Sequence, residues 1–303
     1  MSNDPLAGRR KDAPLPVRWV EPSFAIVGPV AKSVQNWDYY EGALVTVGFT
    51  DGKTYNVAGS GVMVAPGLVL TATHVVREHA DALEAKSLNL YCHGLRSKGR
   101  ADLWVYRSLT YAEDESDIAF VGVELNSEIG DDWYVSCLPI STRAPSKGEA
   151  LSIVGFRFDD PGAVAALPPI DGIPVASRGQ LYIAAGKTED VYYPIHDRVM
   201  APFPTIEVTC GSLGGMSGGA VIDREGAVVG ILSNSLNTAD GRGPSFAAWI
   251  IHALMFEVTL PWPPGLYTPK TPILDLPESQ IKIIGRDKVE RTGPRQIDYS
   301  LWR

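Results

Sequence analysis

The sequence predicts an all-β fold built from many short strands. Its 303 residues include 30 glycines and 23 prolines, which favour frequent turns and therefore short strands. Short apolar segments alternate with turn signals along the chain. This alternation is typical of β-barrels rather than of repeated strand–helix–strand units. The length suffices for a sizeable core, arranged as one large domain or as two lobes.

The first half of the chain contains most of the strands expected for one barrel. Segments 43–49 and 55–58 flank an Asp51-Gly52 pair, which supplies the positive φ of a tight hairpin turn. A second hairpin is expected around Pro66-Gly67, and a short helix over residues 75–86. The remaining strand candidates here are residues 23–28, 62–64, 68–72, 88–92, 103–106 and 118–123.

The second half repeats this pattern after a linker at residues 139–148. Residues 157–174 are rich in proline, glycine and aspartate. They are expected to form a long inserted loop near the cleft between the two halves of the chain. A final helix is expected over residues 250–256, followed by a proline-punctuated tail that drapes over the domain or binds a partner. The strands expected here begin at Glu149 and continue at residues 180–185, 191–195, 205–208, 220–222, 228–232 and 246–249.

Composition narrows the functional class. The net charge of −8 and the pI of about 5.2 argue against a general nucleic-acid binder. No apolar run approaches the roughly 20 residues of a membrane helix, and the N-terminus lacks the apolar core of a secretory signal. The three cysteines are too few and too scattered for a disulfide framework or a metal site. We therefore expect a cytoplasmic protein with free buried thiols, no metal or cofactor, and no nucleic-acid or membrane partner.

A glycine-rich loop at residues 214–219 surrounds a single serine, Ser217, and leads directly into the apolar strand 220–222. Clustered glycines mark a backbone that turns tightly or approaches a ligand closely. Such a loop presents the serine hydroxyl as a nucleophile and directs backbone N–H groups at the oxyanion that the attack creates. The loop by itself also fits a plain turn.

Upstream of this loop, a histidine and an aspartate each mark a strand. His74 ends the apolar run at residues 68–73, and Asp117 begins the run at 118–121. The order is His74, Asp117, Ser217, with separations of 43 and 100 residues. A histidine can accept the serine proton near neutral pH, and an aspartate can hold its other ring nitrogen. Taken singly, His74 also suits a core histidine, Asp117 a strand-start cap and Ser217 a turn residue.

With these motifs in this order, the chain resembles the chymotrypsin/trypsin-like serine proteases. It is most similar to their bacterial branch without disulfides, the HtrA-like and glutamyl-endopeptidase-like proteins. The resemblance covers roughly residues 40–255 and rests on segments 59–64, 68–74, 116–119, 148–156 and 214–219. It implies two six-stranded antiparallel β-barrels of chymotrypsin-like type with few short helices. The implied organisation is a flexible arm at 1–20, a first barrel at 21–140, a second barrel at 141–262 and a tail at 263–303.

The resemblance also implies an activity. The family cleaves peptide bonds of protein or peptide substrates through an acyl-enzyme, here on Ser217 of a His74–Asp117–Ser217 triad. The N–H groups of Gly215 and Ser217 correspond to the oxyanion hole. Ser233 matches the family serine that lies beside the acid and begins the substrate-binding strand. The substrate-binding positions implied are Gly211, Ser212, Ser233, Asn234 and Ser235.

Two departures from the family pattern bear on specificity and control. Gly211 stands where trypsin has the pocket aspartate, and residues 231–233 fill the stretch where glutamate-selective relatives have a histidine. A small or medium uncharged side chain before the scissile bond is therefore expected. Met216 replaces the aspartate that pairs with the new N-terminus of activated animal proteases. The alternatives left open are a protease that stays latent until a partner protein activates it, and a silent barrel that binds peptides or partners.

Overall fold

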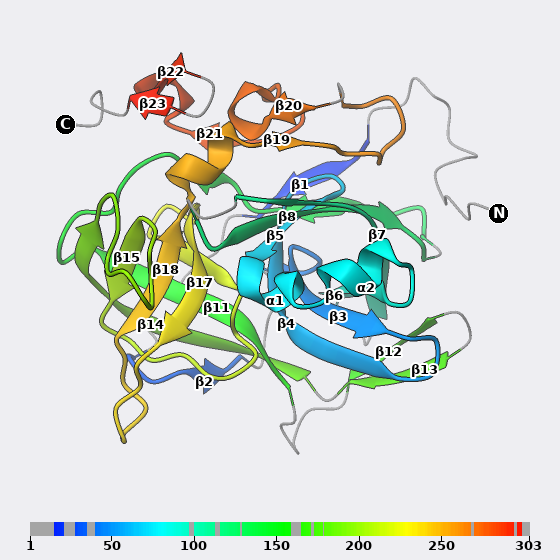
Figure 1. Ribbon diagram of the computed structural model, residues 1–303. Coiled ribbons are helices and arrows are strands. Elements are labelled where there is room, and N and C mark those ends of the chain that lie inside the picture. The colour runs from blue at the N-terminus through cyan, green and yellow to red at the C-terminus, as the bar shows by residue number, and fades with distance from the viewer. Residues whose placement is uncertain are drawn as a thin grey trace.

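Two β-barrels lie beside each other in the computed structural model, with a C-terminal segment across one end (Figure 1). The structure describes residues 15–20, 28–34, 40–96, 100–112, 116–127, 129–158, 165–170, 173–177, 179–267, 270–293 and 296–298. The predicted all-β class with two six-stranded antiparallel barrels and few short helices is confirmed. No helix in these ranges is long and apolar enough to cross a membrane.

The first barrel closes in the order β3-β4-β5-β8-β7-β6, with every neighbouring pair antiparallel. The expected strands 55–58 and 62–64 are one continuous strand that pairs with β3 and then with β5. The strands are β3 (Leu44–Thr50), β4 (Tyr55–Ala65), β5 (Leu68–Ala72), β6 (Asn89–Arg96), β7 (Arg100–Tyr111) and β8 (Ile118–Leu125).

The second barrel closes in the order β16-β11-β14-β15-β18-β17 through an antiparallel β16–β17 pairing. The expected strand 180–185 and the first two residues of the expected strand 191–195 belong to the single strand β14, and residues 193–195 are not in a strand. The members are β11 (Ala150–Phe158), β14 (Gly179–Tyr192), β15 (Thr205–Val208), β16 (Ala220–Asp223), β17 (Val228–Ser235) and β18 (Ser245–Trp249). Strands β10 (Ile140–Ser141) and β21 (Ile283–Ile284) extend its sheet from β17, and β2 (Lys32–Ser33) pairs with β14.

The helix expected over residues 75–86 is two short helices, α1 (Thr73–Arg77) and α2 (Ala80–Glu84). The break falls at His79, whose φ of −104° and ψ of 1° are not helical. The His79 ring packs on Phe49 with ring centroids 4.1 Å apart. The expected helix 250–256 is a 3₁₀ helix, η4 (Ile250–Met255).

Three expected irregular segments contain regular structure. The expected loop 157–174 includes part of an antiparallel hairpin, β12 (Ala165–Ile170) with β13 (Ile173–Ser177). In the expected arm, β1 (Val17–Trp19) pairs in parallel with β9 (Val135–Cys137). The strand expected at 23–28 lies almost wholly outside the described residues. The C-terminal segment contains β19 (Glu257–Val258), β20 (Thr271–Pro272), η5 (Ile273–Asp275), η6 (Arg286–Lys288), β22 (Glu290–Gly293) and β23 (Gln296–Asp298).

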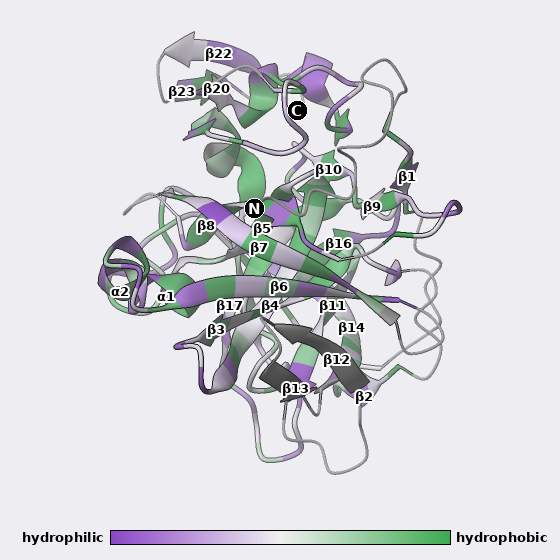
Figure 2. Cartoon of the chain, turned by 90° about the vertical axis from the view of Figure 1, so that its right-hand side faces the viewer, coloured by the Kyte–Doolittle hydropathy of each residue, from purple (hydrophilic) through white to green (hydrophobic). Residues whose placement is uncertain are grey.

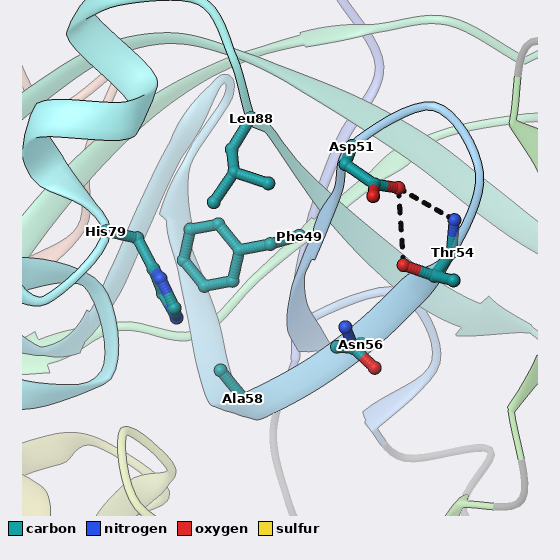
Figure 3. Close-up of a pocket in the computed structure, with 7 residues that line it drawn as sticks. All are labelled: Phe49, Asp51, Thr54, Asn56, Ala58, His79 and Leu88. Carbon is teal, nitrogen blue, oxygen red and sulfur yellow. Dashed lines mark hydrogen bonds between the residues drawn. The ribbon is translucent and has the colours of Figure 1, made fainter.

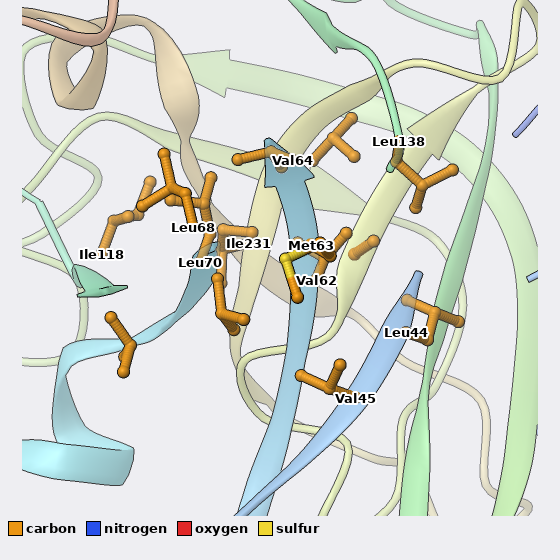
Figure 4. Close-up of a cluster of buried hydrophobic side chains, with 14 of the residues drawn as sticks. Leu44, Val45, Val62, Met63, Val64, Leu68, Leu70, Ile118, Leu138 and Ile231 are labelled. Carbon is orange, nitrogen blue, oxygen red and sulfur yellow. The ribbon is translucent and has the colours of Figure 1, made fainter. Parts of the chain in front are cut away.

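One apolar core runs through both barrels. Figure 2 shows apolar residues in green along the strands of both barrels. Figure 4 shows Ile231 of β17 beside Leu68 and Leu70 of β5, so the cores meet between these two strands. Burial of such side chains is the main force that holds the barrels together. This contact positions the candidate site residues, because His74 follows the end of β5 and Ser233 lies on β17.

Trp262, the residue directly before the tail, is packed against the first barrel. The rings of Trp262 and Trp104 meet edge to face with centroids 5.2 Å apart, a favourable arrangement for an aromatic pair. Gly67 lies so close to the carbonyl oxygen of Trp262 that a Cβ at that position would lie 2.3 Å away. The three cysteines Cys92, Cys137 and Cys210 are free and buried, as expected.

Candidate active site

His74 and Asp117 meet at the edge shared by β5 and β8. The pairing of Ala72 with Ile118 brings the end of one strand beside the start of the other. The Asp117 carboxylate accepts the backbone N–H of His74 at 3.1 Å on Oδ1 and contacts His74 Nδ1 at 2.8 Å on Oδ2. This double contact fixes the imidazole ring and leaves its Nε2 directed away from the carboxylate.

Ser217 joins the same cluster through Ser233. The Ser233 hydroxyl donates to Asp117 Oδ2 at 2.6 Å, and the Ser217 hydroxyl donates to the Ser233 carbonyl oxygen at 3.2 Å. In the described part of the chain, no hydrogen bond joins Ser217 to His74. The fold therefore brings together all three residues selected from the sequence, together with Ser233.

The charge environment of His74 favours its protonated form. Partial burial opposes a charge on the ring. The hydrogen bond that His74 donates to Asp117, the charge of Asp117 and the charge of Glu78 outweigh burial and raise the pKa of His74 above its ordinary 6.5. The His74 side chain is 49% exposed, whereas that of Asp117 is 11% exposed. A shielded carboxylate thus supports an imidazole that remains accessible to a substrate.

The residues before Ser217 form a tight turn. The N–H of Met216 donates to the Leu213 carbonyl oxygen at 3.1 Å, and Gly215 has a φ of +91°. A positive φ near +80° at the third position is the signature of a type II turn, whose central peptide is flipped relative to type I. Among the described residues, the N–H groups of Gly215 and Ser217 have no acceptor. Two backbone donors beside one hydroxyl are thus left available.

The residues after Ser217 turn the chain sharply into β16. Gly218 has a φ of +82°, and a Cβ there would lie 2.1 Å from the Ser60 carbonyl oxygen. At Gly219 a Cβ would lie 2.2 Å from the Val154 carbonyl oxygen. Neither position has room for a side chain, which gives the physical reason for both glycines.

Ser60 is a site residue that the sequence reasoning did not identify. It is buried on β4, and its N–H donates to the Ser217 carbonyl oxygen at 2.8 Å. Its hydroxyl donates to the Gly215 carbonyl oxygen at 2.9 Å and accepts the N–H of Phe156 at 2.8 Å. Ser60 thus ties the Ser217 loop to both barrels. The sequence feature that could have identified Ser60 as a site residue is its position between two glycines, at 59 and 61.

Met216 orders the loop by packing rather than by charge. Its side chain is fully buried, and its sulfur accepts the N–H of Leu213 at 3.3 Å. Its carbonyl oxygen accepts the N–H of Gly219 at 2.9 Å. A Cβ on Gly155 would lie 3.0 Å from the Met216 Cβ, so the neighbouring strand is in close contact with it. An apolar anchor occupies the position where animal relatives form an ion pair.

Ser212, one of the residues expected to bind substrate, is held by Asn237, a second residue that the sequence reasoning missed. The Asn237 side chain donates to the Ser212 carbonyl oxygen at 2.5 Å and accepts the Ser212 N–H at 3.3 Å. A Cβ on Gly211 would lie 2.0 Å from the Gly241 carbonyl oxygen, so no acidic side chain fits at Gly211. Position 211 therefore contributes no charged side chain.

The remaining expected positions lie on β17. Asn234 donates to the Met200 carbonyl oxygen at 3.3 Å, and Ser235 ends the strand. Thr209, two residues before Gly211, accepts the N–H of Lys187 on β14 at 2.9 Å. Its hydroxyl therefore has a structural partner in the second barrel.

Solved structures to which this chain is similar include two at low sequence identity. The solved MamO protease domain from Magnetospirillum magneticum is 16% identical, with 69% of this chain and 93% of that chain aligned at a TM-score of 0.43. The HtrA-type protease AlgW, solved with a decapeptide, is 15% identical at a TM-score of 0.44. That alignment covers 76% of this chain and 63% of AlgW.

Sequence comparison gives a family but no individual relative. No curated protein matches the sequence. The family model described as a trypsin-like peptidase domain matches residues 59–231, which is more than half of the chain. The matched span contains His74, Asp117 and Ser217. The chain therefore belongs to the trypsin-like peptidase domain family.

Proposed function

We propose that the protein is a serine endopeptidase in which Ser217 attacks the carbonyl carbon of a peptide bond. His74 accepts the hydroxyl proton through Nε2 and then passes it to the leaving amine. Asp117 holds the Nδ1–H and stabilises the imidazolium that forms. Water, activated by the same histidine, then hydrolyses the acyl-enzyme on Ser217. The observation that carries this proposal is the 2.8 Å contact between His74 and Asp117 beside Ser217.

The tetrahedral intermediate requires donors for its negative oxygen. The N–H groups of Gly215 and Ser217 are suited to this role because neither has an acceptor among the described residues. Losing one such donor typically costs about 2.7–4 kcal/mol of transition-state stabilisation. The type II turn at Gly215 supports an oxyanion hole that is already formed before substrate binds.

We further propose that the Ser217 hydroxyl is restrained at rest. It donates to the Ser233 carbonyl oxygen at 3.2 Å and must rotate about χ1 to reach His74. Catalytic hydrogen bonds are often loose before substrate binds, so a peptide substrate alone could draw the hydroxyl across. An activating partner protein is the other route. The same resting contact favours the second candidate function, a silent barrel that binds peptides.

A fluorophosphonate probe separates these possibilities, because it labels a serine only when the hydroxyl is activated. We expect labelling of the wild-type protein and of Ser87→Ala, in which the serine replaced lies outside the site. We expect none for Ser217→Ala or His74→Ala. Labelling that appears only after cell lysate is added would indicate latency. Absence of labelling under both conditions would refute the peptidase and favour the binding module.

A further inference from the structure

A pocket of about 150 Å³ opens in the first barrel between the β3–β4 hairpin and the helical segment. Figure 3 shows that its lining has two chemically distinct sides. One side is apolar or aromatic and consists of Phe49, Ala58, Leu88 and the ring of His79. The other side is polar and consists of Asp51, Thr54 and Asn56. Cavities of this volume hold one ring-sized group.

The pocket adjoins the Ser217 cluster. Ala58 directly precedes Gly59 on β4, and a Cβ on Gly59 would lie 2.8 Å from the Ser217 carbonyl oxygen. His79 follows α1, the helix whose first turn carries His74. Since a strand advances about 3.3 Å per residue, the pocket wall lies within a few residues of the proposed nucleophile.

The chemistry of the proposed reaction determines which half of a substrate passes this pocket. His74 gives its proton to the leaving amine, so the residues after the scissile bond must start beside His74. The acyl half is expected along Ser233 to Ser235, in the second barrel. The leaving half therefore runs over the first barrel, in the direction of Ala58. This step rests on the peptidase function proposed above.

We propose that this pocket binds a lysine or arginine side chain from one of the first two residues after the scissile bond. Long basic side chains bury an aliphatic stem and keep a charged head in a polar environment. Phe49 and Leu88 offer the apolar surface for the stem. Asp51, on the opposite side, offers the carboxylate for the head.

The Asp51 carboxylate is preorganised for a cation. Its Oδ1 accepts the N–H groups of Lys53 and Thr54 at 2.8 Å each and the Thr54 hydroxyl at 3.2 Å. These backbone bonds lower the pKa of Asp51 below 3.8, so the group is charged at neutral pH. In the part of the chain that the structure describes, Oδ2 has no hydrogen-bond partner.

A second acid contacts a residue of the pocket wall. Glu78 is exposed and lies 3.4 Å from Nε2 of His79, which lines the pocket. The basic residue nearest to Asp51 in sequence is Lys53, which is exposed and lies outside the pocket lining. The one nearest to Glu78 is Arg77, whose guanidinium lies over the Tyr111 ring. A cation bound at Asp51 would thus meet complementary charge, which discriminates against acidic side chains at this position.

Internally quenched peptides test the inference. The residues before the scissile bond are held constant, while the two residues after it are varied among lysine, arginine, leucine and glutamate. We expect kcat/KM to be at least about tenfold higher for a basic residue than for leucine, a difference of about 1.4 kcal/mol. Asp51→Asn keeps the acceptor for Lys53 and Thr54 but removes the charge, and should abolish the preference. Lys53→Ala should retain it.

Equal rates for all four side chains, or an unchanged preference in Asp51→Asn, would overturn the inference while leaving the peptidase intact. Binding of the same peptides to Ser217→Ala, followed by fluorescence anisotropy, provides a readout without catalysis. A basic preference in binding without any cleavage by the wild type would support the pocket and refute the proposed reaction. Absence of both would refute both.

Discussion

Replacing Ser60 with alanine removes one hydroxyl that three segments share. The hydroxyl lies on β4, donates to the Gly215 carbonyl oxygen and accepts the N–H of Phe156 on β11. Alanine fits the space but loses both hydrogen bonds of the hydroxyl, one to the Gly215 carbonyl oxygen and one from the Phe156 N–H. The net contribution of one such hydrogen bond is about 0.5–1.5 kcal/mol. We therefore expect the free energy of unfolding of Ser60→Ala to fall by about 1–3 kcal/mol.

The same substitution should impair catalysis more than stability alone explains. Without the Ser60 hydroxyl, the Gly215 carbonyl loses a fixed donor, and the turn that carries the Gly215 N–H becomes looser. Complete loss of one oxyanion donor costs about 10²–10³ in kcat, and a loosened donor should cost about 10- to 100-fold. KM should change little, because the oxyanion forms only in the transition state.

Two assays on the same proteins test this reasoning. Urea denaturation followed by tryptophan fluorescence gives the free energy of unfolding, and cleavage of a quenched peptide gives kcat and KM. Thr205→Val is a matched control. Thr205 lies on β15, and the substitution removes its buried hydroxyl, which donates to the Phe203 carbonyl oxygen at 2.8 Å. A kcat for Ser60→Ala as high as that of Thr205→Val would refute the role of Ser60 in holding the loop.

Two further predictions follow from charged groups. The pKa of His74 is raised in part by Glu78, and the imidazole must be neutral to accept a proton. Glu78→Gln should therefore lower that pKa and move the acid limb of the kcat/KM profile to lower pH; a limb that stays in place or moves to higher pH would contradict this. Asp102 accepts hydrogen bonds from Arg96 Nε at 2.7 Å and from Trp133 at 3.0 Å, with both charged side chains buried. Asp102→Asn should lower the free energy of unfolding by about 3–5 kcal/mol, because it leaves the buried Arg96 cation uncompensated. Chemical denaturation measures this loss. A loss below about 1 kcal/mol would show that water already solvates the pair.

Local patterns in the sequence predicted much of the fold. Strand β15 and the β3–β4 hairpin lie close to their expected positions, because apolar runs and an Asp-Gly turn are short-range signals. The members of the candidate site were also found, since His74, Asp117 and Ser217 each stand at a strand end or in a glycine loop. Their roles in catalysis remain predictions.

Other elements were placed wrongly because long-range contacts override local preference. The helix expected over residues 75–86 breaks at His79, whose ring packs on Phe49 from another strand. The strands expected at 55–58 and 62–64 are continuous in β4, because that strand pairs with β3 along one part and with β5 along the next. Neither pairing can be read from the residues of the strand itself.

The site shows the same division on a smaller scale. Sequence alone pointed to the candidate side chains and to the glycines beside Ser217, because these depend on residue type and on neighbours along the chain. The tertiary structure decided which groups hold them. Ser60 reaches Gly215 across 155 residues, and Ser233 reaches Asp117 across 116. The pocket beside Ala58 likewise combines a hairpin with a helix end. Such contacts arise only when two barrels close and pack, so their partners have no signature in the linear chain.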